Sequence, residues 1–171
     1  DLTGWRKPIS HYRDMLWNVE EGAADVYLAI REPDYYFNGH VTETMWSVWP
    51  TWESWNWRGW EGKDIEAEIY TKAPKVRLYL NDKLIAERDV NIDTQYKAVI
   101  KLPYQPGILK AVSVDANGKE MAESTLRTSG EPAAIRLTPD RKIISADGQD
   151  LAFIYVDVVD KDGNIVADAD I

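Results

Sequence analysis

The sequence has no cysteine, only two histidines, no cluster of lysine and arginine, and no long apolar run. Without cysteine the chain has no disulfide, no thiolate nucleophile and no cysteine-bound zinc. The net charge of −9 argues against a nucleic acid or an anionic membrane as a partner, because phosphate groups need a basic surface. Spanning a bilayer takes about 18 consecutive apolar residues, and no segment has them.

The two histidines and the acidic clusters offer little catalytic chemistry. His11 directly follows Ser10, whose hydroxyl cannot easily reach the imidazole in the geometry of a serine hydrolase triad. His40 and Glu43 resemble part of a metal-ligand pattern, but a zinc site needs three or four ligands and no others are suitably spaced. Residues 160–164 lack the late glutamate of a calcium loop and are interpreted as a hairpin turn. We therefore expect no catalytic residue, no metal site and no cofactor.

Tryptophan is abundant and concentrated. Six of the eight tryptophans lie close together, at Trp46, Trp49, Trp52, Trp55, Trp57 and Trp60. Their spacing fits neither the alternation of a strand nor the 3.6-residue repeat of a helix, and Pro50 would interrupt both. We therefore predict a loop over residues 45–60. Each indole can bury roughly 150 to 250 Å², so six exposed indoles would exceed the apolar patch of a typical soluble monomer. The loop must pack against something or bind something.

Two interpretations of the Trp-rich loop are open, and both can hold at once. In the first, the indoles fold over the end of a β-sandwich or dock on a helix, with Trp5 and Trp17 in the same cluster. In the second, one or two indoles face outward and stack on a sugar ring, while polar neighbours bond its hydroxyls. The candidate sugar-binding residues are Trp49, Trp52, Trp55, Asn56, Trp57, Arg58 and Trp60. Nearby acids (Glu43, Glu53, Glu61) are interpreted as solvated side chains rather than paired glycosidase carboxylates.

The remaining pattern predicts one short helix followed by β-strands. Pro8 suits the first position of the helix, Gly22 ends it, and one helical face carries Ile9, Tyr12, Leu16 and Val19. Alternating apolar positions then predict strands at residues 26–30, 65–69, 76–80 and 96–100. Turn-forming residues separate the strands at 81–82, 103–107 and 117–118. The predicted fold class is all-β, an immunoglobulin-like antiparallel β-sandwich with a short N-terminal helix and a partial second sandwich.

The predicted organisation has three parts. Residues 1–22 are the helical segment, and residues 23–128 are the sandwich that carries the Trp-rich loop. Residues 129–171 are an incomplete second immunoglobulin-like domain, with strands expected at 134–138 and 151–159. Some 40 residues fall short of the roughly 100 of a complete domain of this type. We expect its unpaired edges to be poorly ordered or to pair with a neighbour, including another copy in a homo-oligomer.

Several segments resemble bacterial family 2 glycoside hydrolases of the β-galactosidase type. Residues 1–8, with Tyr12-Arg13 and Trp17, resemble the end of the catalytic (β/α)₈ barrel in that family. A second group of segments resembles the immunoglobulin-like domain that follows the barrel. These segments are Trp55-Asn56-Trp57, Glu61-Gly62 and residues 70–73, 76–81, 104–112 and 126–130. Residues 147–151 and 156–160, with Gly163, resemble the opening of the next sandwich domain. Their common order and spacing make the resemblance specific.

The resemblance implies a non-catalytic C-terminal fragment of a β-galactosidase or related β-glycosidase. The catalytic glutamates of the family lie on earlier barrel strands, and nothing in this sequence matches them. The implied partner is the upstream catalytic barrel of the same parent chain, against which the Trp-rich loop would pack and shape one edge of the sugar site. The implied location is the periplasm or outside the cell.

Two other classes of protein are also compatible with the sequence. A stand-alone carbohydrate-binding module predicts exposed, coplanar tryptophans. An adhesin-like immunoglobulin repeat with a structural role predicts a fully buried aromatic cluster. The solvent exposure of the tryptophans therefore distinguishes the two classes.

Overall fold

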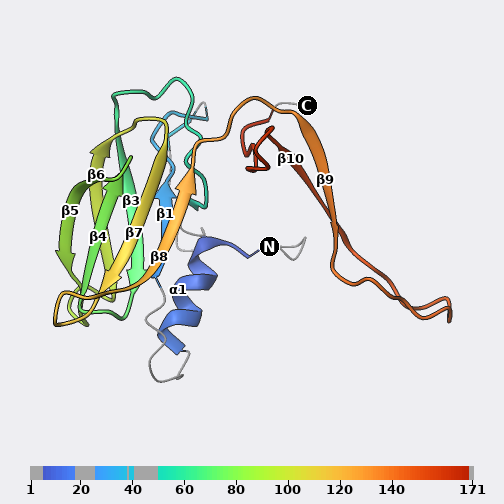
Figure 1. Ribbon diagram of the computed structural model, residues 1–171, viewed down its shortest axis with the longest axis horizontal. Helices are drawn as coiled ribbons and strands as arrows, with labels where there is room; N and C mark the ends of the chain where they lie inside the picture. Colours follow the sequence, from blue (N-terminus) through green and yellow to red (C-terminus); the bar gives the residue numbers. More distant parts are fainter. Residues whose placement is uncertain (1–5, 18–25, 38, 41–49, 170–171) are drawn as a thin grey trace. The chain divides into compact units, whose positions relative to one another are not determined.

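The computed structural model describes residues 6–17, 26–37, 39–40 and 50–169 (Figure 1). The chain divides into two compact units, Asp1–Thr128 and Ser129–Ile171. The elements of the first unit are α1 (Pro8–Trp17), β1 (Val26–Arg31), β2 (Thr51–Trp52), β3 (Asp64–Thr71), β4 (Lys75–Leu80), β5 (Lys83–Asp89), β6 (Lys97–Pro103), β7 (Ile108–Val114) and β8 (Glu120–Arg127). The second unit contains β9 (Ala134–Pro139) and β10 (Ile154–Val159). None of the described helices is long and apolar enough to cross a membrane.

The first unit is an antiparallel β-sandwich, which confirms the predicted fold class. One four-stranded sheet has the order β2-β1-β3-β6, and the other has the order β5-β4-β7-β8. Alternate residues of each strand point into one core between the sheets, as the period of a strand requires. The core includes Leu28, Ile30, Ile65, Ala67, Ile69, Ala98, Ile100 and Leu102 from the first sheet and Val76, Leu78, Leu80, Leu109, Ala111 and Leu126 from the second.

The predicted turns at 81–82 and 117–118 close the β4–β5 and β7–β8 hairpins, and the predicted turn at 103–107 connects β6 of one sheet to β7 of the other. Asn81 and Asp82 both have positive φ angles, 51° and 62°, as a two-residue turn between twisted strands requires. The Asn81 side chain also accepts a hydrogen bond from the Ile108 N–H at 2.8 Å. Gly107 has a φ of 137°, and a Cβ atom there would collide with the Asn81 side chain. Glycine at this position therefore lets two neighbouring turns approach closely.

Helix α1 docks on the first sheet through a face different from the predicted one. Its buried residues are Pro8 and Met15. His11 stacks on Tyr27 with ring centroids 4.3 Å apart, and the Tyr12 hydroxyl donates to the backbone oxygen of Gln95 at 2.8 Å. The docked positions 8, 11, 12 and 15 also follow helical spacing. Of the predicted face, only Tyr12 belongs to this set, and Val19 lies outside the described residues.

Trp17 joins no aromatic cluster among the described residues. Its side chain is 71% exposed at the end of α1, so this part of the prediction is wrong. Positions 8, 11, 12 and 15 of the helix face the sheet, and position 17 is not one of them. Trp5 lies outside the described residues.

The second unit contains a two-stranded antiparallel sheet. Strands β9 and β10 pair from Ala134 with Val159 to Pro139 with Ile154. Apolar side chains on both strands are largely exposed, among them Ile135 at 65% and Val156 at 61%. Within the described residues 129–169, these strands form a hairpin and not a closed sandwich.

The turn at residues 160–164 is organised by one buried carboxylate. Asp160 accepts hydrogen bonds from the backbone N–H groups of Gly130 at 2.8 Å and Asn164 at 2.9 Å. The Asn164 side-chain amide donates to Asp160 as well, at 3.0 Å. These donors favour the ionised form and hold the pKa of Asp160 well below its usual value. The predicted hairpin turn is confirmed, and the Asp160 carboxylate serves the turn.

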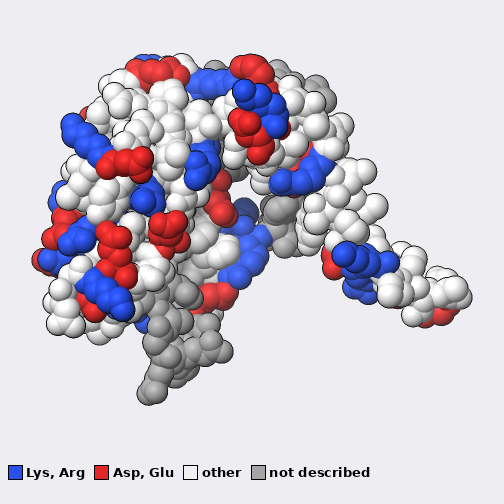
Figure 2. All heavy atoms as spheres, viewed as in Figure 1, with Lys and Arg blue, Asp and Glu red and all other residues white. Residues whose placement is uncertain are grey.

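Charged side chains of both signs are interspersed over the visible face of the first unit (Figure 2). Glu87 on β5, for example, bonds both Lys75 and Arg77 of β4, at 2.9 and 2.7 Å. On this face, the described residues form no continuous basic patch of the kind that a nucleic acid would need.

Candidate functional site

Two buried indoles anchor the Trp-rich loop in the core of the sandwich. Trp55 and Trp57 are 0% and 2% exposed. The Trp55 indole N–H donates to the backbone oxygen of Gln105 at 3.0 Å, and that of Trp57 donates to the backbone oxygen of Ser54 at 3.2 Å. The Tyr104 hydroxyl donates to the Trp55 backbone oxygen at 3.1 Å. Both buried indoles thus have the polar partner that burial requires, and this part of the loop is fixed.

The loop contains one short strand that the sequence did not indicate. Thr51 and Trp52 form β2 and pair with Arg31 and Ile30 of β1. Pro50 lies just before β2 and has no backbone N–H to donate. Its carbonyl oxygen accepts a hydrogen bond from the Glu32 N–H at 2.8 Å. The described residues 53–60 contain no strand or helix, as predicted. Residues 45–49 lie outside the described residues.

The candidate sugar-binding residues fall into two groups in the structure. Trp55, Asn56 and Trp57 are buried, whereas Trp52 is 48% exposed, Arg58 is exposed and Trp60 is half-buried. Trp49 lies outside the described residues. Among the described tryptophans of the loop, only Trp52 and Trp60 therefore have indole surface open to a ligand.

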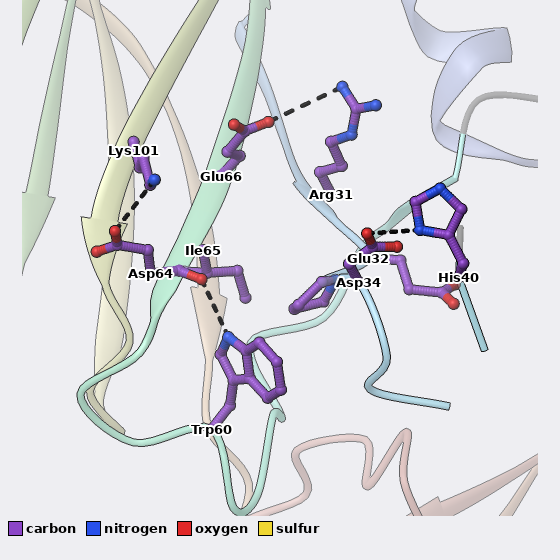
Figure 3. A pocket seen from close by; sticks show the side chains of 10 residues that line it. Arg31, Glu32, Asp34, His40, Trp60, Asp64, Ile65, Glu66 and Lys101 are labelled. Atoms are coloured by element: carbon purple, nitrogen blue, oxygen red, sulfur yellow. Dashed lines mark hydrogen bonds and ion pairs between the residues drawn. The ribbon is translucent and has the colours of Figure 1, made fainter. Parts of the chain in front are cut away.

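Trp60 borders a pocket of about 500 Å³ on the first unit (Figure 3). Besides Trp60, the pocket is lined by the end of β1 and the residues after it (Arg31, Glu32, Pro33, Asp34), by His40, by the start of β3 (Asp64, Ile65, Glu66) and by Lys101 of β6. Strand register explains this convergence, because Arg31 lies opposite Glu66 and Glu66 lies opposite Lys101. The three side chains form one row on the outer face of the sheet.

The sequence analysis missed this pocket. Its lining comes from five separate stretches of the chain, and no local motif joins them. The alternation of charged residues with core residues on β3 was visible, but pairing the charges across strands requires the register.

The charged groups of the pocket are paired around its opening. Asp64 lies 3.1 Å from the Lys101 ammonium, and Glu66 lies 3.8 Å from the Arg31 guanidinium. The pocket also holds a 2.7 Å contact between His40 and Asp34 and a 2.9 Å hydrogen bond from the Trp52 indole to Glu32. Four carboxylates thus face two permanent cations. Among the described residues, no group of three or more histidine, aspartate and glutamate side chains is placed to hold a metal ion.

A second polar cluster lies beneath α1 and fastens the helix. The Tyr27 hydroxyl donates to Glu53 at 3.0 Å, and the Tyr70 hydroxyl donates to the buried Glu68 at 2.9 Å. Burial, with the neighbouring carboxylate second, raises the pKa of both tyrosines well above the usual range. Burial and then Arg6 lower the pKa of His11. These groups are engaged with one another, so the cluster is interpreted as structural.

The chain is similar to several known proteins. Residues 135–171 match the family model for glycoside hydrolase family 2 C-terminal domain 5, and residues 62–122 match a domain of unknown function, DUF4982. The β-galactosidase BoGH2A of Bacteroides ovatus is 41% identical over 101 residues, which cover 59% of this chain and 12% of that protein. A β-galactosidase of Thermoanaerobacter pseudethanolicus is 29% identical over 118 residues, which cover 60% of this chain and 16% of that protein.

Solved structures agree with these matches. The crystal structure of a glycosyl hydrolase family 2 member from Bacteroides cellulosilyticus aligns with a TM-score of 0.84 and 34% identity, over 96% of this chain and 21% of that one. A β-glycosidase from Bacteroides vulgatus, at 21% identity and a TM-score of 0.72, shares the fold. The fold and the matches are similar to a β-sandwich region of family 2 glycoside hydrolases. The similarity is to the C-terminal region of these enzymes, which confirms the resemblance seen in the sequence.

Proposed function

We propose that the chain is a non-catalytic C-terminal region of a β-galactosidase-type enzyme, that it supports the catalytic barrel of the parent protein, and that its Trp-rich loop shapes one edge of the sugar site. The rigid attachment of this loop carries the proposal. Trp55 and Trp57 fix the loop from inside the core, while Trp52 stays exposed on the outside. Because the loop is already ordered, its exposed indole can contact a neighbouring surface at little cost in conformational entropy.

The surroundings of Trp52 support a contact with the barrel. Its backbone pairs with β1 and its indole N–H is bonded to Glu32, so the exposed side chain has a fixed orientation. Phe37, 57% exposed, lies beside it with ring centroids 6.2 Å apart. Adjacent exposed aromatic rings are typical of surfaces that another domain or a ligand covers.

Helix α1 supplies a second connection in this proposal. The resemblance assigns it to the last strand–helix unit of the barrel, and here it docks on the sandwich through His11 and Tyr12. A barrel that ends in this helix would be tied directly to the first sheet. We place the parent enzyme in the periplasm or outside the cell on family resemblance alone.

The replacement Trp52→Ala in the parent enzyme tests the role of the loop. We expect the KM for a nitrophenyl β-galactoside to rise about tenfold, or the Tm to fall by a few degrees, because an exposed aromatic anchor is lost. Met121→Ala is the matched control, since Met121 lies on the other sheet and is also 48% exposed. If Trp52→Ala leaves both KM and Tm at the control values, the loop does not contact the barrel or its sugar site.

The exposure of Trp52 also favours a second candidate function, that of a stand-alone carbohydrate-binding module. Such a module would bind a polysaccharide without the barrel, which intrinsic fluorescence would detect. Trp55 and Trp57 cannot belong to a coplanar platform of tryptophans, because both are in the core. A purely structural adhesin-like repeat is less well supported, since its aromatic cluster should be fully buried.

A further inference from the structure

The pocket beside Trp60 has the construction of a binding site, and Trp52 is not part of its lining, although the Trp52 indole bonds the lining residue Glu32. Its volume of about 500 Å³ falls within the range of roughly 300 to 1,000 Å³ that is usual for small-ligand sites. The row formed by Arg31, Glu66 and Lys101 lies on paired strands, so the sheet holds these side chains in register. Binding groups on a rigid sheet are positioned more accurately than groups on a loop.

We propose that this pocket binds one neutral sugar unit of a glycan. The inference extends the proposed function and rests on its carbohydrate context. A pyranose ring has an apolar face and a rim of hydroxyl groups, so its site needs an aromatic surface together with charged or polar partners. The pocket supplies both, because the indole of Trp60 lies at one side of the opening and the Arg31–Glu66 pair at the opposite side (Figure 3).

The aromatic surface of the pocket is held in place by its neighbours. The Trp60 indole N–H donates to the backbone oxygen of Asp64 at 3.0 Å. The Lys63 ammonium lies 4.3 Å from the ring centroid and covers one side of the indole. A sugar in the pocket would contact the remaining indole surface, and the fixed N–H prevents the ring from rotating away.

The paired charges suit hydroxyl groups. A carboxylate paired with a cation still has lone pairs for hydroxyl donors, and the cation beside it can donate to a hydroxyl oxygen. Asp64 with Lys101 and Glu66 with Arg31 provide this combination twice. Two adjacent hydroxyls of one sugar would each meet a donor and an acceptor.

The balance of charge selects a neutral sugar over an acidic one. Four carboxylates and two permanent cations line the opening, so the uncompensated charge is negative. A hexuronate would bring another carboxylate into this field and would be repelled, whereas a neutral hexose would not.

Titration of the ¹⁵N-labelled 171-residue chain, followed by NMR, tests the proposal. The ligands are methyl β-galactoside and methyl β-galacturonide, which differ in charge. With the neutral ligand we expect saturable shifts of the Trp60 indole N–H and of the backbone amides at residues 31, 32, 34 and 64–66. Replacing Glu66 by Gln should weaken binding about tenfold, because a charge-assisted hydrogen bond is lost. The uronide should bind at least about tenfold more weakly than the neutral ligand.

Glu123→Gln is the matched control for Glu66→Gln. Glu123 is an exposed carboxylate paired with Lys110 at 3.9 Å on the other sheet, far from the pocket lining. This variant should bind like the wild type. The proposal is overturned if neither ligand causes saturable shifts at the pocket residues, if Glu66→Gln binds like Glu123→Gln, or if the uronide binds as tightly as the neutral ligand. Such a result would not contradict the proposed support of the barrel, because that function is tested separately in the parent enzyme.

Discussion

Each described tryptophan of the loop has a role that follows from the partner of its indole N–H. Trp55, Trp57 and Trp60 donate to backbone oxygens, of Gln105, Ser54 and Asp64 respectively. Trp52 instead donates to a side chain, Glu32, and is also the most exposed of the four. The backbone-bonded indoles are therefore held in place, Trp55 and Trp57 in the core and Trp60 beside the pocket, and Trp52 is suited to an external contact.

Trp55→Ala should lower the free energy of unfolding by about 3 to 5 kcal/mol, because a fully buried indole is replaced by a cavity. Urea unfolding of the chain, followed by the fluorescence of the remaining tryptophans, measures this loss. Trp52→Ala serves as the comparison and should cost less than about 1 kcal/mol, since its side chain is half exposed. Equal losses in the two variants would show that Trp55 does not anchor the loop.

The sequence predicted the loop but not the role of each tryptophan in it. The density of indoles and the absence of a period were visible in residues 46–60. Burial of Trp55 depends on Tyr104 and Gln105, which lie about fifty residues further along the chain. Contacts of this range are set by the packing of the sandwich, so a local pattern cannot reveal them.

Among the elements, the strands with alternating apolar residues were predictable and the others were not. β3 and β4 were found because their core-facing residues repeat every second position. β5 is exposed along almost its whole length, and β2 has only two residues, so neither shows an alternation that can be recognised. The helix was found but its docked face was not, because two apolar faces share helical spacing. The aromatic surface of Tyr27 and Tyr70 selects between them.

The docking of α1 should weaken on acidification. The pKa of His11 lies below its ordinary value of 6.5, through burial and then Arg6, although the nearby Glu53 and Asp14 act in the opposite direction. Because docking lowers the pKa of His11, the undocked helix binds the proton at a higher pH than the docked helix does. The contribution of His11 is therefore complete above pH 6.5 and falls as the pH drops below that value.

Hydrogen exchange of the α1 amides at pH about 7.5 and about 5.5 measures this effect, after correction for the intrinsic dependence on pH. The protection should fall at the lower pH in the wild type and in His40→Phe. His11→Phe keeps a ring to stack on Tyr27 but cannot be protonated, so its protection should not change. An equal loss of protection in His11→Phe would exclude His11 as the cause.

For the whole molecule, the two units differ in how much apolar surface they bury. The first unit has a core closed between two sheets. The second exposes apolar residues on both strands of its hairpin, including Leu137 at 61% and Ile154 at 59%. The sandwich class could be predicted from the spacing of strands and turns, but the order of strands in each sheet and the pocket over β1, β3 and β6 could not. Both depend on which strands pair and in which register.

The central claim is that this chain assists a sugar-cleaving enzyme and does not itself hydrolyse the glycosidic bond. Turnover of a nitrophenyl β-galactoside by the purified chain, measured beside the parent enzyme, tests it most directly. We predict release of nitrophenol at the rate of the buffer blank, because the pocket carboxylates are engaged with Lys101, Arg31, His40 and Trp52. Turnover above the blank that disappears in Asp64→Asn or Glu66→Gln would contradict the account.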